Sequence, residues 1–323
     1  MGTSLQRKRL PGSLISVAKD SMRVGNSCGR CRHFLLAFLF LVFATVSISA
    51  QEVPPSADTL TRLRNQIATG DKEQKRSALL EIRNLRDAEA SRVAVPALRD
   101  KDPIVRATAA SSVVFMPSDE AASVLIPLLG DKDEFVRREA AFAAGEAGHN
   151  SATPAILRLL QTDKSFEVKA AAAVALGKIG DPAAVASLTA ILRDRPSEDN
   201  EFIRRSAARS LGQIAQVMLT GKSKVITPQN FLPEKFKDLG TDSRVEAIST
   251  VQTTFANATD VLMRLLKSSD ESDDTRREAA FSLGAIGDRN AVSLLQTYTS
   301  SPDPYLAEIC KEALLKISRL HGA

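Results

Sequence analysis

The chain has 323 residues, of which 44% are hydrophobic and 5% aromatic, and tryptophan is absent. It can therefore bury a sizeable core made mainly of Ala, Leu, Ile and Val, a composition that suits closely packed helices. Residues 1–50 hold seven of the 43 basic side chains and one of the 38 acidic ones, so residues 51–323 carry 36 basic and 37 acidic side chains despite the net charge of +5. Nucleic-acid binding needs a basic stripe on the folded domain, so this balance argues against a nucleic-acid partner.

The N-terminal segment has the order of a secretory signal peptide. Arg30 and Arg32 precede an apolar run at 34–44, and small residues lead from there to Ala50. A basic region, an apolar run and a small residue before the cleavage site are typical of such signals. We therefore expect residues 1–50 to be a signal peptide cleaved after Ala50, and the protein to be exported to the periplasm or the exterior.

Two alternatives stay open for this segment. A start at Met22 would give a signal of ordinary length and leave residues 1–21 untranslated. The apolar run is short for a membrane span of about 20 residues, but an uncleaved anchor would attach the protein to a membrane. Cys28 and Cys31 form a CxxC pair without a second pair, so we expect no metal or redox role for them.

A repeat fills the rest of the sequence. Its marker positions follow one another at steps of 31 to 40 residues: Gln74, Val105, Val136, Val168, Ile203, Ser243, Thr275 and Leu306. A small residue stands four positions after each marker, and mostly apolar residues stand eight and eleven positions after it. These steps follow one face of an α-helix, so each copy predicts a helix whose small residue meets a neighbouring helix.

Turn signals follow each of these predicted helices. Gly148, Gly180 and Gly287 stand twelve positions after a marker, where a residue of left-handed conformation can end the helix. Asp181 and Pro182 are then suited to the N-cap and first turn of a second helix. A single pair of helices cannot bury both of its faces, but a stack of pairs can. The sequence therefore predicts an all-α solenoid.

Four segments carry a family resemblance: DKDPIVRATAA (100–110), DKDEFVRREAAFAAGEAG (131–148), VKAAAAVALGKIGDPAAV (168–185) and TRREAAFSLGAIGDRNAV (275–292). The chain resembles the HEAT-repeat family, in the short form named after phycobilisome (PBS) lyases. The resemblance implies a right-handed α-solenoid. It also implies a structural ladder between adjacent repeats, made by an Asp and a basic residue six positions later. The corresponding pairs are Asp100 with Arg106, Asp131 with Arg137, Asp163 with Lys169, and Asp270 with Arg276.

The domain plan follows from the repeat. We expect a linker and capping helix at 51–69, the solenoid at 70–319 and a tail at 320–323. An insertion at 219–242 interrupts the solenoid, and a clear second helix is missing there. Phe231 and Phe236 in this insertion are candidates for binding a partner, and the alternative is a degenerate repeat that packs over the core.

The sequence shows no motif of known catalysis. No HExxH, Walker A, GxSxG or His-Glu sequence is present, and only His149 and His321 follow the signal segment. Repeated His-Glu pairs hold the two irons of deoxyhypusine hydroxylase, a relative built on similar repeats. We therefore expect no catalytic, metal-binding or cofactor-binding residues, no cofactor, and no enzymatic activity.

What remains is the extended surface of the stack. Arg99, Arg158, Arg193 and Arg264 stand late in the second helices, which the resemblance places on the concave face. They would either meet an acidic partner or simply face solvent. We expect an exported scaffold or adaptor that binds a protein or peptide. The alternatives are a PBS-lyase-like protein that holds or attaches a cofactor in the groove, and a membrane-anchored structural component of an envelope complex.

Overall fold

The computed structural model describes residues 54–221 and 241–322. The predicted signal peptide, its alternative start, and both Phe231 and Phe236 lie outside these residues. All regular secondary structure in the described part is helical. No helix there is long and apolar enough to cross a membrane.

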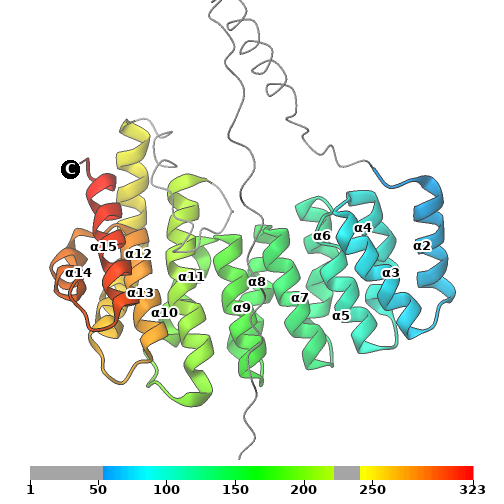
Figure 1. Ribbon diagram of the computed structural model, residues 1–323, viewed down its shortest axis with the longest axis horizontal. Helices are drawn as coiled ribbons and strands as arrows, with labels where there is room; N and C mark the ends of the chain where they lie inside the picture. The colour runs from blue at the N-terminus through cyan, green and yellow to red at the C-terminus, as the bar shows by residue number, and fades with distance from the viewer. Residues whose placement is uncertain (1–53, 222–240, 323) are drawn as a thin grey trace, which may run out of the picture. The chain divides into compact units, whose positions relative to one another are not determined.

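The helices form two layers (Figure 1). The inner layer consists of α3 (Lys72–Leu85), α5 (Pro103–Ser112), α7 (Glu134–Ala147), α9 (Phe166–Ile179), α11 (Glu201–Thr220), α13 (Asp273–Ile286) and α15 (Pro304–Leu320). The outer layer consists of α4 (Ala88–Ala94), α6 (Ser118–Leu125), α8 (Thr153–Thr162), α10 (Val185–Ile191), α12 (Thr241–Lys267) and α14 (Val292–Tyr298). α2 (Ala57–Thr69) packs against α3 at the N-terminal end. The described fold is thus an α-solenoid.

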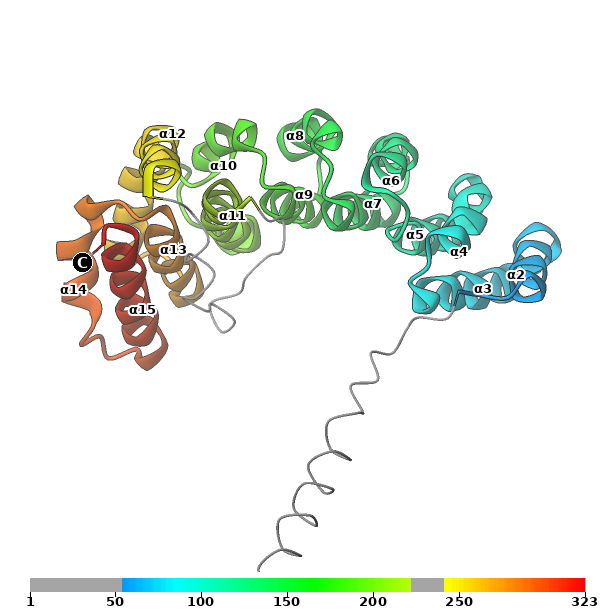
Figure 2. The ribbon, with the colours of Figure 1, turned by 90° about the horizontal axis from the view of Figure 1, so that it is seen from above.

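The two layers lie on opposite sides of the curved solenoid. Figure 2 shows α4, α6, α8, α10 and α12 along the outside of the curve, and the inner-layer helices along the inside. The marker helices therefore line the inner side. The expectation that the second helices line the concave face is wrong for this chain.

The small residue four positions after each marker is a contact between inner-layer helices. Seven of these residues are at most 1% exposed: Ala78, Ala109, Ala140, Ala172, Ala207, Ala279 and Cys310. Because adjacent inner-layer helices pack directly on one another, only a short side chain fits between their backbones. The predicted role of this column is confirmed in the inner layer.

Residues at two further positions of the repeat let these helices approach closely. A Cβ atom built on Gly145 would lie 2.7 Å from the Cα atom of Ala175 in the next inner-layer helix. In three other places a serine seven positions after the marker donates a hydrogen bond to a carbonyl oxygen of the preceding inner-layer helix: Ser112 to Leu79, Ser210 to Ala173 and Ser282 to Ala208, at 2.6 to 2.9 Å. These contacts fix the spacing of the inner layer.

The predicted glycine turns are also confirmed. Gly148, Gly180 and Gly287 end α7, α9 and α13 with φ of 69°, 79° and 77°. This left-handed region has no steric cost for glycine. The chain reverses there, and a short 3-10 turn leads into each outer-layer helix, as Pro182–Ala184 leads into α10.

The copy predicted at Ser243 does not form two helices. α12 runs unbroken from Thr241 to Lys267, because no glycine or proline interrupts this stretch. It lies in the outer layer, and α11 contacts α13 directly. The hydrogen bond from Ser282 to Ala208 repeats the geometry of the other inner-layer contacts. The two steps from Ile203 to Thr275 therefore make one structural repeat.

The last inner-layer helix differs from the four before it at one contact position. Gly145, Gly177, Gly212 and Gly284 stand nine positions after their markers and each lies against the next inner-layer helix. In α15 the same position is Leu315, which is 57% exposed.

Candidate functional site

A row of ion pairs joins successive repeats beside the starts of the inner-layer helices. Lys75 Nζ lies 2.7 Å from Asp100 Oδ2. Arg106 donates two hydrogen bonds to the carboxylate of Asp131, at 2.8 and 2.9 Å, and Arg137 donates two to Asp163, at 2.6 and 3.0 Å. Each basic side chain thus reaches the acidic residue of the next repeat, which makes three closed rungs.

Electrostatics at these rungs favours the ionised acids. Burial by itself would raise the pKa of Asp131, but hydrogen bonds from Arg106 and from the Asp133 N–H outweigh it. The pKa of Asp131 therefore lies below its ordinary value. The same balance lowers the pKa of Asp163, whose side chain is 4% exposed, where burial is outweighed by Arg137 and the Ser165 N–H. Both acids stay charged because each is fully paired.

The predicted pairing differs from the observed one. Arg106 and Arg137 do contact the aspartates six positions earlier, but only at the backbone: each donates to the carbonyl oxygen of Asp100 or Asp131. Asp163 pairs with Arg137 instead of Lys169. Side-chain pairing spans two repeats because each guanidinium lies between the loop before its own helix, where it binds a carbonyl oxygen, and the loop before the next inner-layer helix, where it binds the carboxylate.

The last predicted pair is also wrong. No ion pair joins Asp270 and Arg276 among the described residues, and Arg276 donates to the Leu266 carbonyl oxygen. The neighbouring residues take over this role. Glu271 forms a buried ion pair with Arg204, and Arg277 binds Asp303 at 2.8 Å.

The pair of Arg204 and Glu271 bridges the long step in the sequence. Their side chains are 2% and 4% exposed. Arg204 also donates to the carbonyl oxygens of Ile191 and Asp194, at 3.1 and 2.5 Å. Its guanidinium therefore ties the end of the fourth repeat to the loop before α13.

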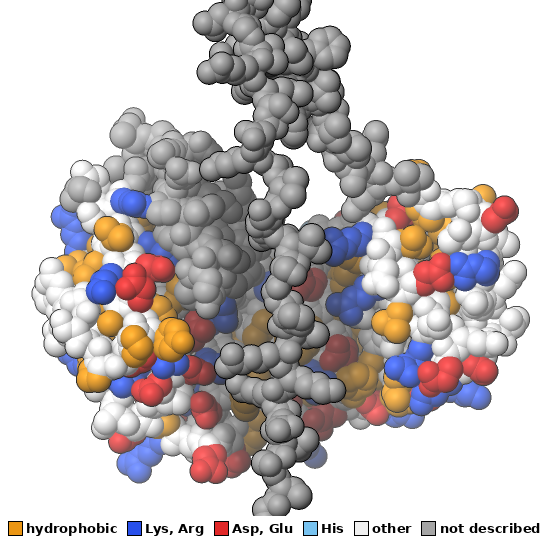
Figure 3. Space-filling view, in the orientation of Figure 1, with side chains coloured by type: hydrophobic (Ala, Val, Ile, Leu, Met, Phe, Trp, Pro, Cys, Tyr) orange, Lys and Arg blue, Asp and Glu red, His pale blue; other side chains and the backbone are white. Residues whose placement is uncertain are grey.

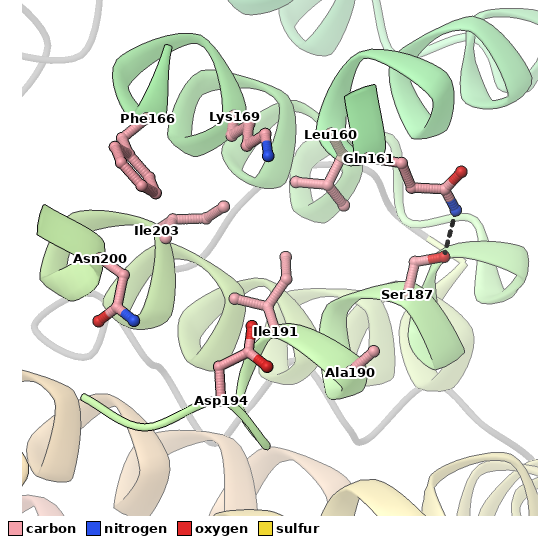
Figure 4. A pocket seen from close by; sticks show the side chains of 10 residues that line it. All are labelled: Leu160, Gln161, Phe166, Lys169, Ser187, Ala190, Ile191, Asp194, Asn200 and Ile203. Atoms are coloured by element: carbon pink, nitrogen blue, oxygen red, sulfur yellow. Dashed lines mark hydrogen bonds between the residues drawn. The ribbon is translucent and has the colours of Figure 1, made fainter. Parts of the chain in front are cut away.

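One rung of the ladder is open. In each of the first two rungs the acid stands 25 residues after the basic residue, and the same step leads from Lys169 to Asp194. No ion pair or hydrogen bond of the described residues joins the side chains of Lys169 and Asp194. Both line a pocket of about 380 Å³, together with Leu160, Gln161, Phe166, Ser187, Ala190, Ile191, Asn200 and Ile203. Figure 4 shows Lys169 and Asp194 pointing into this pocket from opposite sides.

The inner layer exposes several large hydrophobic side chains. The large hydrophobic side chains that are at least 36% exposed in the described residues all belong to inner-layer helices: Leu80, Phe135, Phe142, Phe166, Phe202, Tyr305 and Leu315. Figure 3 shows hydrophobic side chains among charged ones on one face of the molecule. Phe202 and Tyr305 are 65% and 70% exposed.

Arginines lie against three of these rings. Arg138 lies over Phe135, Arg205 over Phe202 and Arg277 over Tyr305, with 5.1 to 5.2 Å between the guanidinium carbon and the ring centre. One face of each ring is therefore covered by a cation, which stabilises an exposed aromatic side chain through the quadrupole of the ring. The exposed surface of the inner layer therefore combines apolar and charged contact groups.

A hollow of about 360 Å³ lies on this surface between α11, α13 and α15. Its lining includes Arg209, Tyr305 and Glu278. Burial raises the pKa of Glu278, although Arg209 lies 3.4 Å away and opposes the shift. Glu278 Oε2 has no hydrogen-bond partner, so this carboxylate is poorly compensated.

The predicted partner-binding arginines lie elsewhere. Arg99, Arg158 and Arg264 are exposed on the outer layer or the 3-10 turn beside it, and Arg193 is exposed just after α10. No ion pair or hydrogen bond in the described part of the chain joins any two of them. The sequence did not single out the exposed aromatic residues of the inner layer. Their position one residue before a marker, as in Phe135, Phe202 and Tyr305, was the signal available.

Residues suited to metals and covalent chemistry are sparse. No group of three or more His, Cys, Asp and Glu residues in the described ranges is arranged to hold a metal ion. Cys310 is buried, and burial raises the pKa of its thiol to about 12. This thiol is therefore unreactive at neutral pH.

Comparison with known proteins gives the following similarities. The family model of HEAT repeats matches residues 60–144 and 122–212, and the PBS lyase HEAT-like repeat matches 275–300. Deoxyhypusine hydroxylase-B of Oryza sativa subsp. japonica is 39% identical over 57 residues, which are 18% of this chain and 19% of that protein. The chain thus spans about a fifth of the length of the curated relative that it matches.

Two solved structures are similar as well. The complex of CpcE and CpcF of phycocyanin lyase from Nostoc sp. PCC7120 aligns with a TM-score of 0.46 and 18% identity, over 85% of this chain and 96% of that chain. A designed armadillo repeat protein in complex with the peptide (KR)4 aligns with a TM-score of 0.41 and 17% identity, over 80% of this chain and 99% of that chain.

These comparisons correct one expectation. The absence of known catalytic motifs led to the prediction that the chain is not an enzyme. The chain shares a stretch of sequence with a deoxyhypusine hydroxylase, which is an enzyme, and this similarity overturns the prediction. Missing motifs exclude particular chemistries, not catalysis in general.

Proposed function

Since the chain belongs to the HEAT-repeat family, with a PBS-lyase-like repeat near its C-terminal end, we propose that it is a scaffold whose inner layer binds an extended segment of a protein partner. The observation that carries this proposal is the location of the exposed large hydrophobic side chains, all of them on inner-layer helices in the described residues. Exposed apolar surface rimmed by polar groups is typical of interaction sites.

The spacing of the surface suits an extended partner. Adjacent packed helices lie about 8–10 Å apart, which is close to the length of three residues of extended chain. Phe202 and Tyr305 would contact side chains of the segment, and neighbouring Arg205 and Arg277 would contact its polar groups. Aromatic and arginine side chains are the groups that most often dominate binding energy at protein interfaces.

Site-specific photo-crosslinking tests this proposal. A photoreactive phenylalanine analogue at Phe142 or Phe202 should form adducts with a partner protein in cells, while the same analogue at Arg158 of the outer layer should not. The double variant Phe142→Ser/Phe202→Ser should recover at least about tenfold less partner. The charge reversals Arg158→Glu and Arg193→Glu serve as the matched control and should leave recovery unchanged.

The opposite pattern would reject the inner layer as the binding face. Adducts from Arg158 alone, together with loss of the partner on reversal of Arg158 and Arg193, would place the site on the outer layer. Recovery of a chromophore or metal in equal amount with the pure protein would favour the cofactor-holding alternative.

Export is a second part of the proposal. The order of basic, apolar and small residues before Gln51 supports cleavage after Ala50. Mass spectrometry of the protein from its native cells should find a mature chain that begins at Gln51, outside the cytoplasm. Intact Phe34–Ala50 in a membrane fraction would support the anchored alternative instead.

A further inference from the structure

The groove beside the ladder can be compared at two places in the stack, one with a closed rung and one with the open rung. Around the closed rung of Arg106 and Asp131 the groove is lined by both side chains, and they bind each other. Around the open rung the corresponding side chains, Lys169 and Asp194, line the pocket without a mutual contact. Equivalent positions of two repeats thus hold one pair of charges that bind each other and one pair that do not.

The chain around Asp194 explains why this rung is open. In the closed rungs the aspartate is held by the N–H two residues later, as Asp131 is by Asp133 at 2.8 Å. After Asp194 the loop is longer, since α11 starts only at Glu201. Asp194 is exposed, and the residue two positions later is Pro196, which has no N–H to hold the carboxylate. Its carboxylate therefore stays outside the position that its counterparts occupy.

The pocket walls are otherwise suited to a small apolar group. Figure 4 shows the side chain of Ile191 between the two charged groups and that of Leu160 beside Lys169, with Phe166 and Ile203 toward one end. Asn200 adds an amide at the same end. A cation, an anion and an apolar wall thus meet in one cavity of about 380 Å³.

We propose that this open rung binds a small zwitterion with an apolar substituent, of the α-amino acid type. The carboxylate of the ligand accepts hydrogen bonds from the Lys169 ammonium group. The ammonium group of the ligand donates to the carboxylate of Asp194. The substituent packs against Leu160 and Ile191. The ligand thereby completes the rung that the chain leaves unpaired, at a pocket that shares Phe166 with the exposed hydrophobic side chains of the inner layer.

Calorimetric titration of the purified full chain with three matched probes tests this site. L-leucine should bind at millimolar concentrations. N-acetyl-L-leucine, which lacks the ammonium group, and L-leucinamide, which lacks the carboxylate, should each bind at least about tenfold more weakly, because each loses one charge-assisted contact. Asp194→Asn and Lys169→Gln should weaken leucine binding by a similar factor. Lys75→Gln, which opens the first closed rung, should leave it unchanged.

Three results would overturn the proposal. They are equal binding of the three probes, no heat of binding with L-leucine at tens of millimolar, or unchanged binding by Asp194→Asn. The probe series uses the unaltered protein, so it decides the question even if a variant folds poorly. Loss of thermal stability in Lys169→Gln as large as in Lys75→Gln, without leucine binding, would mean that the rung closes on itself in solution.

Discussion

The repeats before Asp194 and those after it reach the same inner-layer packing by different means. In the first part, steps of 31 or 32 residues place one inner-layer helix after another, and Lys75, Arg106 and Arg137 each reach the acid of the next repeat. In the second part, 72 residues separate the markers of α11 and α13. Yet Ser282 still binds the carbonyl oxygen of Ala208, as Ser112 binds that of Leu79. The distance between neighbouring inner-layer helices is therefore set by the contacts between them, and the length of chain that connects them can vary.

The largest effect is expected where the second part replaces the ladder. Arg204→Met would leave Glu271 buried without a counter-charge, because that pair is nearly inaccessible to water. We expect the free energy of unfolding to fall by about 3–5 kcal/mol, as measured by urea denaturation. The double variant Arg204→Met/Glu271→Met should recover most of the loss. A loss below about 1 kcal/mol for the single variant would show that this pair does not join the two parts.

An intermediate effect should separate a closed rung from the open one. Arg137→Met removes two charge-assisted hydrogen bonds to Asp163, so we expect a loss of about 1.5–3 kcal/mol. Lys169→Met removes no such bond and should change stability by no more than about 0.5 kcal/mol. Thermal unfolding of both variants in one buffer makes the comparison. Equal losses would mean that the ladder continues through Lys169.

The smallest effect concerns pH, and it has opposite signs in the two parts. The pKa of Asp163 is lower in the folded chain than in the unfolded one, so the stability it contributes is present above pH 4 and is lost as pH falls through the folded pKa. Burial raises the pKa of Glu278, so ionisation of this group costs stability as pH rises through its folded pKa.

Two substitutions make this contrast measurable. Glu278→Gln should raise the free energy of unfolding at pH 7 by at most about 1 kcal/mol and have little effect at pH 4, where Glu278 is largely protonated. Asp163→Asn should lower stability at pH 7 and have a smaller effect at pH 2. Thermal unfolding across this pH range gives both results. A gain for Asp163→Asn at pH 7 would contradict the role assigned to the rung.

Features that depend on one helix face could be predicted from the sequence. The burial of Ala172 and its counterparts, and the helix ends at Gly148, Gly180 and Gly287, follow from local periodicity and backbone conformation. The break in the pattern at Ser243 was also present in the sequence, since that copy has no glycine after its marker. Without a residue that ends the helix, α12 continues past the expected turn.

Features that depend on neighbouring repeats could not be predicted in the same way. The partner of Asp163 is a residue 26 positions earlier, and only the distance between the packed helices decides that Arg137 reaches it while Lys169 does not. The side of the curve on which each layer lies depends on the small rotation between repeats, which no single segment encodes. The sequence places Phe202 and Tyr305 one residue before a marker, but it does not show on which side of the curve their helices lie, so the candidate inner-layer site was missed.

Leu315 limits how closely another helix can pack on the last inner-layer helix. In α7, α9, α11 and α13 a glycine at this position lets the next helix approach closely, but in α15 a leucine side chain stands there and is 57% exposed. A helix of a second molecule could not approach α15 as closely as α9 approaches α7 without moving this side chain. Head-to-tail association of identical stacks leads to open filaments, and Leu315 opposes the closest form of such association.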